Sequence, residues 1–531
     1  MNAAVAPASQ RPAARGSFLL VLAEGLIGAV LVFIGALGVG WLAPGSALNR
    51  WPSLVFWRIE IPGVMTAVVA LTAGVWVMFS AWLRLGRYLQ PWGQSMRALW
   101  IALVVWSLPL MVSIPIFSRD VYAYIGQGRL MRGGFDPYVD SISVLPNWLQ
   151  LGTDVMWADS QTAYGPLFYW MAAGTVALTG LNIEASILGF RLLSWVGIAL
   201  VMFYLPRLAK LHGVNGVKAN WITVANPLFL LSFLASAHND ALMIGLAVGA
   251  TYYAAKRRGV LAIVFLVASV GIKPITLITL PFLALLWAGP NASWPKRIRY
   301  WVYAGVLTIA LCWLMGLPGG LGFGWISATL SAGSGYYVIY APLGFACYVL
   351  FTLCSAFGLG SEWVLSAVGL LGRVAGLAIA VYLVFKGSYS RLVQRLLLAF
   401  AAITVLAPVV HPWYLLWLLP FFAATGIRDD WQSLWVYATV GFFIALGCID
   451  QMFVWDFNNG WEGTLQLISL AVTIISVALL LCSRATRRQL APLMPRRVMK
   501  WLTKVSAKEG TTTRAGDPPP SGTTAPPEAR S

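Results

Sequence analysis

Charged side chains are scarce in this chain, and their scarcity excludes an ordinary soluble enzyme. Only 10% of the 531 residues are charged, whereas 59% are hydrophobic and the mean hydropathy is +0.76. The five cysteines all lie in apolar stretches, with no spacing typical of a disulfide framework or a zinc site. This composition predicts an all-α polytopic membrane protein.

Sequence motifs of several common enzyme classes are also missing. The chain has no glycine-rich phosphate loop, no dinucleotide-binding fingerprint, and no zinc-protease, serine-hydrolase or Cys-x-x-Cys motif. No internal repeat is visible. The net charge of +18 comes from Lys and Arg residues gathered in short loops and at both ends. That distribution indicates positive-inside anchoring among membrane lipids, with no nucleic-acid partner.

The basic loops orient the predicted membrane spans. Arg11 and Arg15 place residues 1–16 in the cytoplasm as an N-terminal arm. Residues 17–97 then form the first two transmembrane helices, and residues 98–483 form the membrane core. Following the charges along the chain gives about 14 transmembrane helices in the plasma membrane.

The C-terminal segment 484–531 is first basic and then rich in Pro, Gly, Thr and Ser. It predicts a largely disordered cytoplasmic tail, so that both termini lie inside. Two apolar stretches are 166–181 and 343–360. If each crossed the membrane, the next basic loop would lie on the outer side, against the positive-inside rule. We expect 166–181 to lie along the outer surface within an outer loop 118–187, and 343–360 to be surface-lying or re-entrant. The number of spans would rise to about 16 if both crossed.

Four distinctive polar groups fall on the outer, periplasmic face in this topology. They are Asp120, the pair His238 and Asp240, Lys273, and His411, each at a boundary of an apolar stretch. Ionisable residues at such boundaries are candidates for a functional site. The alternatives are an ordinary solvated loop with an interfacial aromatic belt, and for Lys273 an anchor whose charged head reaches into water.

The surroundings of Asp120 suggest a chemistry. A carboxylate ringed by tyrosines at the membrane boundary could deprotonate a sugar hydroxyl beside a lipid-borne donor. A phosphate-bearing substrate would suit Lys273 and three arginines of the outer loop, which are Arg119, Arg129 and Arg132.

An ordered set of short motifs then resembles a known family. The motifs are Ser-Arg-Asp-Val-Tyr-Ala-Tyr (118–124), Phe-Asp-Pro-Tyr (135–138), Tyr-Gly-Pro-Leu-Phe (164–168), Ala-Asn-Pro-Leu (225–228), His-Asn-Asp-Ala-Leu-Met (238–243) and His-Pro-Trp-Tyr (411–414). The set resembles the actinobacterial α-1,6-mannosyltransferases that use polyprenyl-phosphate mannose, which belong to the GT-C class of membrane glycosyltransferases. The resemblance covers residues 100–420.

The resemblance implies a GT-C-like fold and an inverting reaction. Mannose would pass from polyprenyl-phosphate mannose to a lipid-linked mannan acceptor, elongating the α-1,6 backbone of lipomannan and lipoarabinomannan. It also implies an acidic residue in the first outer loop, matched by Asp120, and a second acidic site, matched by Asp240. Arg119 precedes Asp120 and no Asp-x-Asp pair is present, so we expect no divalent metal and no other cofactor.

Within this hypothesis Asp120 is the catalytic general base, and Lys273 or an outer-loop arginine neutralises the leaving phosphate. His238, Asp240 and His411 position sugar or phosphate, and four aromatic residues form a stacking and hydrogen-bonding wall. The predicted substrate-binding residues are Arg119, Tyr122, Tyr124, Arg129, Asp136, Tyr138, Tyr164, His238, Asn239, Asp240, Lys273, His411 and Trp413, of which Tyr122, Tyr124, Tyr138 and Trp413 make the wall.

Three other functions stay open from the sequence. A transporter or flippase of a lipid-linked sugar expects polar groups near the midplane and pseudo-repeated halves, and Arg373 within span 364–385 favours it. A GT-C enzyme with another sugar donor would keep the same motifs. A non-catalytic scaffold predicts that Asp120 is dispensable.

Overall fold

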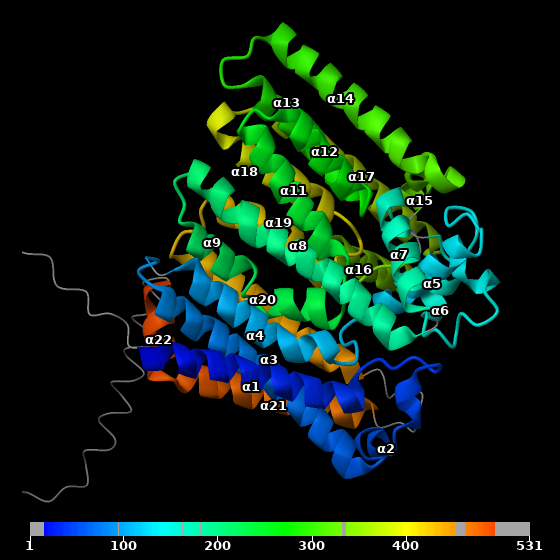
Figure 1. Cartoon of the computed structure of the whole chain (residues 1–531), viewed down its shortest axis with the longest axis vertical. Helices are drawn as coiled ribbons and strands as arrows, with labels where there is room; N and C mark the ends of the chain where they lie inside the picture. The colour runs from blue at the N-terminus through cyan, green and yellow to red at the C-terminus, as the bar shows by residue number, and fades with distance from the viewer. Residues whose placement is uncertain are drawn as a thin grey trace, which may run out of the picture.

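A computed structural model describes residues 15–493, apart from 94, 162, 181, 332–335 and 453–461. Across these residues the protein is built from helices and contains no β-strand (Figure 1). The predicted N-terminal arm up to residue 14 and the predicted disordered tail from residue 494 lie outside the described part of the chain.

Within the described residues, seven helices are long and apolar enough to cross a membrane. They are α1 (Arg15–Val39), α3 (Ile61–Leu89), α8 (Ile183–Leu211), α14 (Trp294–Gly316), α17 (Glu362–Phe385), α20 (Trp431–Asp450) and α21 (Glu462–Cys482). An eighth candidate is bent by 58° between α9 (Gly216–Thr223) and the segment Pro227–Ala235, which contains α10 (Pro227–Leu230) and the π-helix η3 (Leu231–Ala235). These helices confirm a polytopic membrane protein, whereas the number of about 14 spans stays a prediction.

Shorter apolar helices complete the bundle. They are α4 (Met96–Val112), α11 (Asp240–Ala255), α12 (Gly259–Val270), η4 with α13 (Pro274–Thr279 and Leu280–Ala288), α16 (Pro342–Ala356), and η7 with α19 (Pro412–Tyr414 and Leu415–Thr425). The helix α18 (Leu392–Val405) packs between α17 and α19.

The third predicted span ends earlier than the apolar run suggests. The apolar run 98–117 predicts a third span of that extent, but α4 begins at Met96 and ends at Val112. Pro115 explains the early end, because a proline removes a backbone donor and disfavours helical geometry in the residue before it. Asp120 therefore does not follow a span directly. It begins a separate helix, α5 (Asp120–Arg132).

The first large loop forms its own helices at one end of the bundle. The helices α5, α6 (Val155–Ala158) and α7 (Pro166–Thr179) gather at the right-hand end of Figure 1, opposite α9 and α22 (Arg484–Leu490). Pro166 starts α7, Gly180 with φ +62° ends it, and α7 packs on α5. The helix expected over 166–181 thus exists, while its position at a membrane surface stays a prediction.

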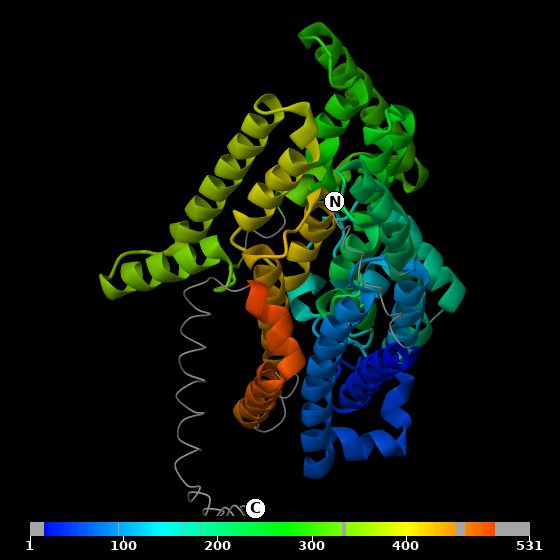
Figure 2. The same ribbon diagram turned by 90° about the vertical axis from the view of Figure 1, so that its left-hand side faces the viewer.

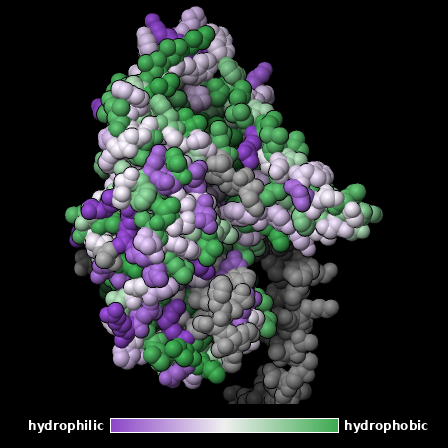
Figure 3. All heavy atoms as spheres, turned by 90° about the vertical axis from the view of Figure 1, so that its right-hand side faces the viewer, coloured by the Kyte–Doolittle hydropathy of each residue, from purple (hydrophilic) through white to green (hydrophobic). Residues whose placement is uncertain are grey.

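Two surfaces of the bundle are visible in the turned views. In Figure 2, α16 projects sideways from the bundle before the chain returns through α17. In the view onto the α5–α7 end (Figure 3), hydrophilic side chains are concentrated on the left-hand half of the face, and hydrophobic ones dominate the top.

The two terminal regions of the described chain meet where α21 packs on α3, with Trp76 Nε1 donating to Thr473 Oγ1 over 3.3 Å.

Candidate active site

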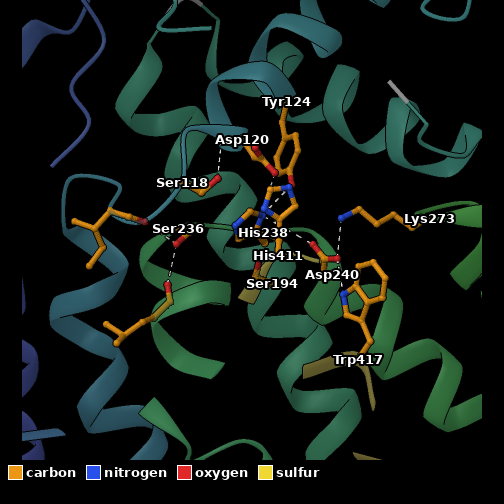
Figure 4. A network of polar contacts seen from close by, with 12 residues as sticks. Ser118, Asp120, Tyr124, Ser194, Ser236, His238, Asp240, Lys273, His411 and Trp417 are labelled. Atoms are coloured by element: carbon orange, nitrogen blue, oxygen red, sulfur yellow. Dashed lines mark hydrogen bonds and ion pairs between the residues drawn. The ribbon is translucent and has the colours of Figure 1, made fainter. Parts of the chain in front are cut away.

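Four chain segments converge beside the first turn of α5. Asp120 begins that helix, His238 and Asp240 lie at the junction between η3 and α11, Lys273 precedes η4, and His411 precedes η7. Figure 4 shows these side chains pointing toward one another. The structure therefore brings together the polar groups that the sequence placed on one face, although their roles stay predictions.

The imidazole of His238 lies between the two carboxylates. Its Nδ1 is 3.4 Å from Asp120 Oδ2, 3.9 Å from Asp240 Oδ2 and 3.4 Å from the hydroxyl of Tyr124. His238 and Asp240 are fully buried, whereas the Asp120 side chain is 18% exposed. Of the two carboxylates, Asp120 is therefore the one that a substrate entering from the protein surface can reach.

The electrostatics of the cluster keep Asp120 ionised. Burial opposes ionisation, but the hydrogen bond and charge of His238, with smaller effects from Lys273 and His411, outweigh it and lower the pKa of Asp120 to about 2. Its place in the first turn of α5 also favours the negative charge. Burial raises the pKa of Tyr124 well above its ordinary value, so its phenol stays protonated as a hydrogen-bond donor.

Asp240 holds Lys273 inside the protein. Lys273 Nζ and Trp417 Nε1 both donate to Asp240 Oδ1, over 2.7 and 2.8 Å. The Lys273 ammonium also lies 5.5 to 5.8 Å from the ring centres of Tyr164, Tyr414 and Trp417, within the range of cation–π attraction. Its side chain is only 12% exposed. The alternative of a Lys273 head reaching into water is therefore wrong.

Trp413 stacks against two histidines. Its ring centre is 4.1 Å from that of His238 and 4.5 Å from that of His411, whose plane is parallel within 1°. Both imidazoles lie against the indole, while the sugar stacking that we expected of Trp413 stays a prediction. Its Nε1 is buried without a partner among the described residues and can bind a substrate.

His411 adds a second imidazole beside Trp413. Its Nε2 is 3.2 Å from the hydroxyl of Tyr336. Burial lowers the pKa of His411 to about 4, against the smaller opposing effect of Asp120. At neutral pH this imidazole is therefore uncharged and can share a hydrogen bond with a phenol or a sugar hydroxyl.

Several residues predicted to bind substrate have other contacts. Arg119 pairs with Asp154 at 3.2 Å and lies 3.7 Å above the Trp41 ring, and Tyr122 donates to the Trp41 carbonyl. These contacts tie the loop to the end of α1 and leave neither side chain directed at Asp120.

Two more predicted residues support the loop, and a third, Arg129, lies away from the cluster. Asp136 accepts the N–H of Tyr138 over 2.9 Å in a turn, and the Tyr138 hydroxyl donates to the Tyr164 carbonyl over 2.9 Å. Arg129 lies nine residues after Asp120, about 13 Å along α5 at 1.5 Å per residue. It is not among the contacts of the cluster in the described part of the chain.

Asn239 differs from these residues, because it lies beside the cluster and its side-chain amide makes no hydrogen bond to the described residues. It is 8% exposed, and neither amide atom has a hydrogen-bond partner among the described residues. It lines a small cavity together with apolar side chains of α7 and α8, including Phe168 and Phe190. A buried amide without a partner is a site for a ligand or water.

Several residues that shape the site were not predicted from the sequence. Trp417 could have been found, because it follows Trp413 by four residues, the spacing of one helical face. Arg191 also carried a signal, since an arginine within an apolar span is rarely without function. Tyr414 ends the motif His-Pro-Trp-Tyr (411–414) and could have been found from it, whereas Tyr336 had no distinguishing signal beyond its aromatic character.

The described residues contain no group of three or more His, Cys, Asp or Glu side chains arranged to hold a metal ion. The site offers the accessible, ionised carboxylate of Asp120 and the ammonium of Lys273, which a second carboxylate holds. It also offers two imidazoles, each stacked on the indole of Trp413. This set can accept a proton at Asp120 and stabilise negative charge near Lys273.

Comparison with known proteins assigns the chain to a family. Residues 22–289 match "Alpha-(1->6)-mannopyranosyltransferase, N-terminal domain" and residues 342–481 match "MptB C-terminal domain". The site draws on both regions, since His411 and Trp413 lie in the second.

Similar proteins come from mycobacteria. A probable alpha-(1->6)-mannopyranosyltransferase of Mycolicibacterium smegmatis is 29% identical, over 88% of each chain. An alpha-(1->6)-mannopyranosyltransferase of Mycobacterium tuberculosis is 29% identical over 90% of this chain and 89% of its own. Alpha-(1->6)-mannopyranosyltransferase A of the same organism is 31% identical over 57% of this chain and 60% of its own. The chain therefore belongs to the alpha-(1->6)-mannopyranosyltransferase family and is a glycosyltransferase.

Proposed function

We propose that the protein transfers mannose, with inversion, from polyprenyl-phosphate mannose to the 6-hydroxyl of a lipid-linked mannan. The observation that carries this proposal is the accessible, ionised carboxylate of Asp120, 3.4 Å from the buried imidazole of His238. Asp120 takes the proton of the acceptor hydroxyl while that oxygen attacks the anomeric carbon. The bond from carbon to the phosphate oxygen breaks, and the polyprenyl phosphate leaves with the electron pair.

The low pKa of Asp120 makes it a weak base in the empty site. A donor phosphate near Lys273 and His238 would share the positive charge that now stabilises the Asp120 carboxylate. Nearby negative charge raises a carboxyl pKa, so donor binding makes Asp120 a stronger base at the step that needs one. The same effect disfavours deprotonation of the acceptor before the donor is bound.

Lys273 stabilises the leaving phosphate as an ammonium held in place. A leaving phosphate needs its charge neutralised more than it needs a proton. Asp240 and three aromatic rings fix the ammonium, so little rotamer entropy is lost when the phosphate arrives. His411, Asn239 and the Trp413 N–H contribute neutral hydrogen bonds to sugar hydroxyls. Because one oxygen of Asp240 is paired with Lys273, we propose that transfer needs no divalent metal.

The membrane arrangement belongs to the same proposal. A GT-C-like bundle of about 14 spans would have the α5–α7 end outside and both termini in the cytoplasm. Two arginines near the end of α3, Arg84 and Arg87, support this orientation, because they bond Glu24 of α1 and Gln489 of α22 at the end away from Asp120. The acceptor would be the α-1,6 backbone of lipomannan and lipoarabinomannan.

A transporter gains little support from the structure. Arg373, which favoured it, is exposed and donates to the Leu330 carbonyl of α15 (Gly324–Ser331) over 3.4 Å. Its contact is thus with another helix of the bundle surface and not with a buried polar pathway.

The test is mannosyl transfer by the purified protein from polyprenyl-phosphate mannose to short α-1,6-mannosides. Lys273→Ala should weaken donor use, because losing a charge-assisted hydrogen bond costs about 1.5–3 kcal/mol, roughly tenfold to 150-fold. Lys273→Arg should retain part of the activity. Lys296→Ala is a matched control, since Lys296 also lies over a tyrosine ring, that of Tyr300, on α14.

Two results would overturn the proposal. One is a wild-type protein that transfers mannose only from a donor other than polyprenyl-phosphate mannose. The other is a Lys273→Ala variant with unchanged rate and unchanged dependence on donor concentration. The rate with EDTA tests metal independence separately, and a loss restored by a divalent ion would contradict that part.

A further inference from the structure

Arg191 is a buried arginine with no role of its own in the proposed mannosyl transfer. It lies in the membrane span α8 and is only 2% exposed. A guanidinium in an apolar interior is costly unless its N–H groups are paired. Arg191 makes five hydrogen bonds, four to backbone carbonyls and one, over 3.4 Å, to Ser113 Oγ.

Those carbonyls come from the ends of two helices. Arg191 Nη1 donates to Met111 and Ser113 at the end of α4, over 3.0 and 2.7 Å. Its Nε and Nη2 donate to Leu234 and Ala235 at the end of η3, both over 2.7 Å. The last carbonyls of a helix lack partners within it and carry the negative end of its dipole. One side chain therefore caps both helices and fixes the spacing of their ends.

Both capped ends lead directly into the candidate active site. After α4 the chain passes through Phe117, with φ +65°, to Asp120, and after η3 it passes through Ala237, with φ +60°, to His238. A positive φ is strained for a residue with a side chain, so each turn needs support from its surroundings.

The two segments are also joined to each other and to α8. Ser236 Oγ donates to the Ile116 carbonyl over 2.7 Å, and Ser194 Oγ donates to the His238 carbonyl over 3.0 Å (Figure 4). Ser194 follows Arg191 by three residues and so lies on the same face of α8.

We infer that Arg191 is a positioning residue that sets the spacing between the Asp120 carboxylate and the His238 imidazole for proton abstraction. The inference rests on the proposed function of Asp120 as the base. Arg191 itself hydrogen-bonds backbone carbonyls and Ser113, and acts on the reaction only through the two segments that it caps. A planar fork of five donors can serve two helix ends at once, whereas a lysine ammonium is a compact point charge with three donors.

The test compares Arg191→Lys with Arg395→Lys in the full-length protein. Arg395 is a matched control, because it is 7% exposed and bonds four carbonyls at the α17–α18 turn, those of Leu383, Val384, Gly387 and Ser388. Both variants lose a buried guanidinium and keep a positive charge. Thermal unfolding in detergent gives the structural cost of each.

We expect Arg191→Lys to lower kcat by about 100-fold, the loss typical of a misplacement of about 1 Å, while KM for the donor changes little. Its acid limb of kcat/KM should move to higher pH, because His238 no longer lowers the pKa of Asp120 fully. Lys273, His411, Asp240 and Tyr124 also face the Asp120–His238 pair and remain in place in the variant. Arg395→Lys should keep the wild-type pH profile and kcat.

Three outcomes would overturn the inference. They are a wild-type kcat and pH profile in Arg191→Lys, an equal activity loss in both variants that follows the folded fraction, and an unshifted acid limb. If Arg191→Lys does not fold, Ser236→Ala takes its place, and it should shift the acid limb in the same direction by a smaller amount. Failure of the proposed function is distinguishable, because Asp120→Asn would then stay active.

Discussion

At the scale of single residues, Asp120 is the side chain on which the proposed reaction depends most directly. Asp120→Asn keeps the shape of the side chain but cannot accept a proton, so transfer should fall by at least the factor of about 100 to 10,000 that general bases contribute. Donor binding, measured without acceptor, should persist. Transfer assays on purified protein make the comparison.

Asp154 offers a matched control for Asp120 in the same loop. It pairs with Arg119 at 3.2 Å and lies outside the cluster, so Asp154→Asn should cost stability more than rate. A non-catalytic scaffold predicts no transfer by the wild type or by either variant. Transfer by Asp120→Asn within a few-fold of wild type would show that Asp120 is not the base.

His411 should make the protein less stable in mild acid. Its folded pKa of about 4 lies below the ordinary value of 6.5, so between these pH values the unfolded chain binds a proton that the folded protein does not. Stability is therefore lost as the pH falls through this window, by at most about 2 kcal/mol at pH 5. Asp120, with a folded pKa of about 2, loses its own contribution only below its ordinary value of 3.8.

The measurement is the midpoint of thermal unfolding at pH 7 and pH 5, for wild type and His411→Gln. The variant should lose less stability between the two pH values, because the amide does not titrate. An equal loss in both proteins would mean that another group titrates in this window.

At the scale of helices, the apolar runs predicted the elements well, but the contacts between them were out of reach. The apolar runs 62–83 and 364–385 lie within α3 (Ile61–Leu89) and α17 (Glu362–Phe385). A long apolar run in a membrane forms a helix because a helix pairs all its backbone polar groups internally. Lys273 and Asp240 stood out in sequence as rare polar residues at the ends of such runs. Their ion pair depends on tertiary packing, which no local pattern encodes.

Trp413 and Arg191 show why the rest of the site could not be predicted. The stacking of Trp413 on the His238 imidazole joins residues far apart in the sequence, so the aromatic character of Trp413 alone could not reveal this partner. The carbonyls that Arg191 caps are up to 80 residues away in sequence. Gly197 allows α8 and α11 to approach, since a methyl group there would lie 2.2 Å from the Ala241 backbone. That close contact is visible only in three dimensions.

The helix α20 should support the site through Gln451 at its C-terminal end. This side chain is 1% exposed, its Oε1 accepts the N–H of Phe117, and its Nε2 donates to the Val39 carbonyl over 2.6 Å. Gln451→Ala leaves both backbone groups unpaired, at about 1–3 kcal/mol each. We expect a lower kcat together with lower stability, because Phe117 leads to Asp120.

The control for Gln451 is Gln489, whose Oε1 accepts a hydrogen bond from Arg87 over 2.6 Å and joins α22 to α3. Gln489→Ala should affect unfolding without affecting kcat of the folded protein. Equal kcat values in the two variants, after correction for the folded fraction, would exclude a link between Gln451 and Asp120.

At the scale of the whole molecule, one site is assembled from both parts of the family match. Asp120, His238 and Lys273 lie in the region 22–289, and His411 lies in the region 342–481. Neither region alone contains both the proposed base and the histidine–tryptophan stack. The packing of α21 on α3 closes the bundle, so the two regions should unfold together.

The orientation of this bundle in the membrane decides whether the site faces a lipid-borne donor on the outside. Single cysteines in a variant without the five native cysteines can test it with a membrane-impermeant maleimide. Phe135 and Val155 are 40% and 68% exposed at the α5–α7 end, so cysteines there should label in intact cells. Cysteines at Arg258 and Trp431, both exposed, should label only after permeabilisation, because positive-inside loops are cytoplasmic. The reverse pattern would show that the basic loops misassign the orientation, and would turn the accessible face of Asp120 toward the cytoplasm.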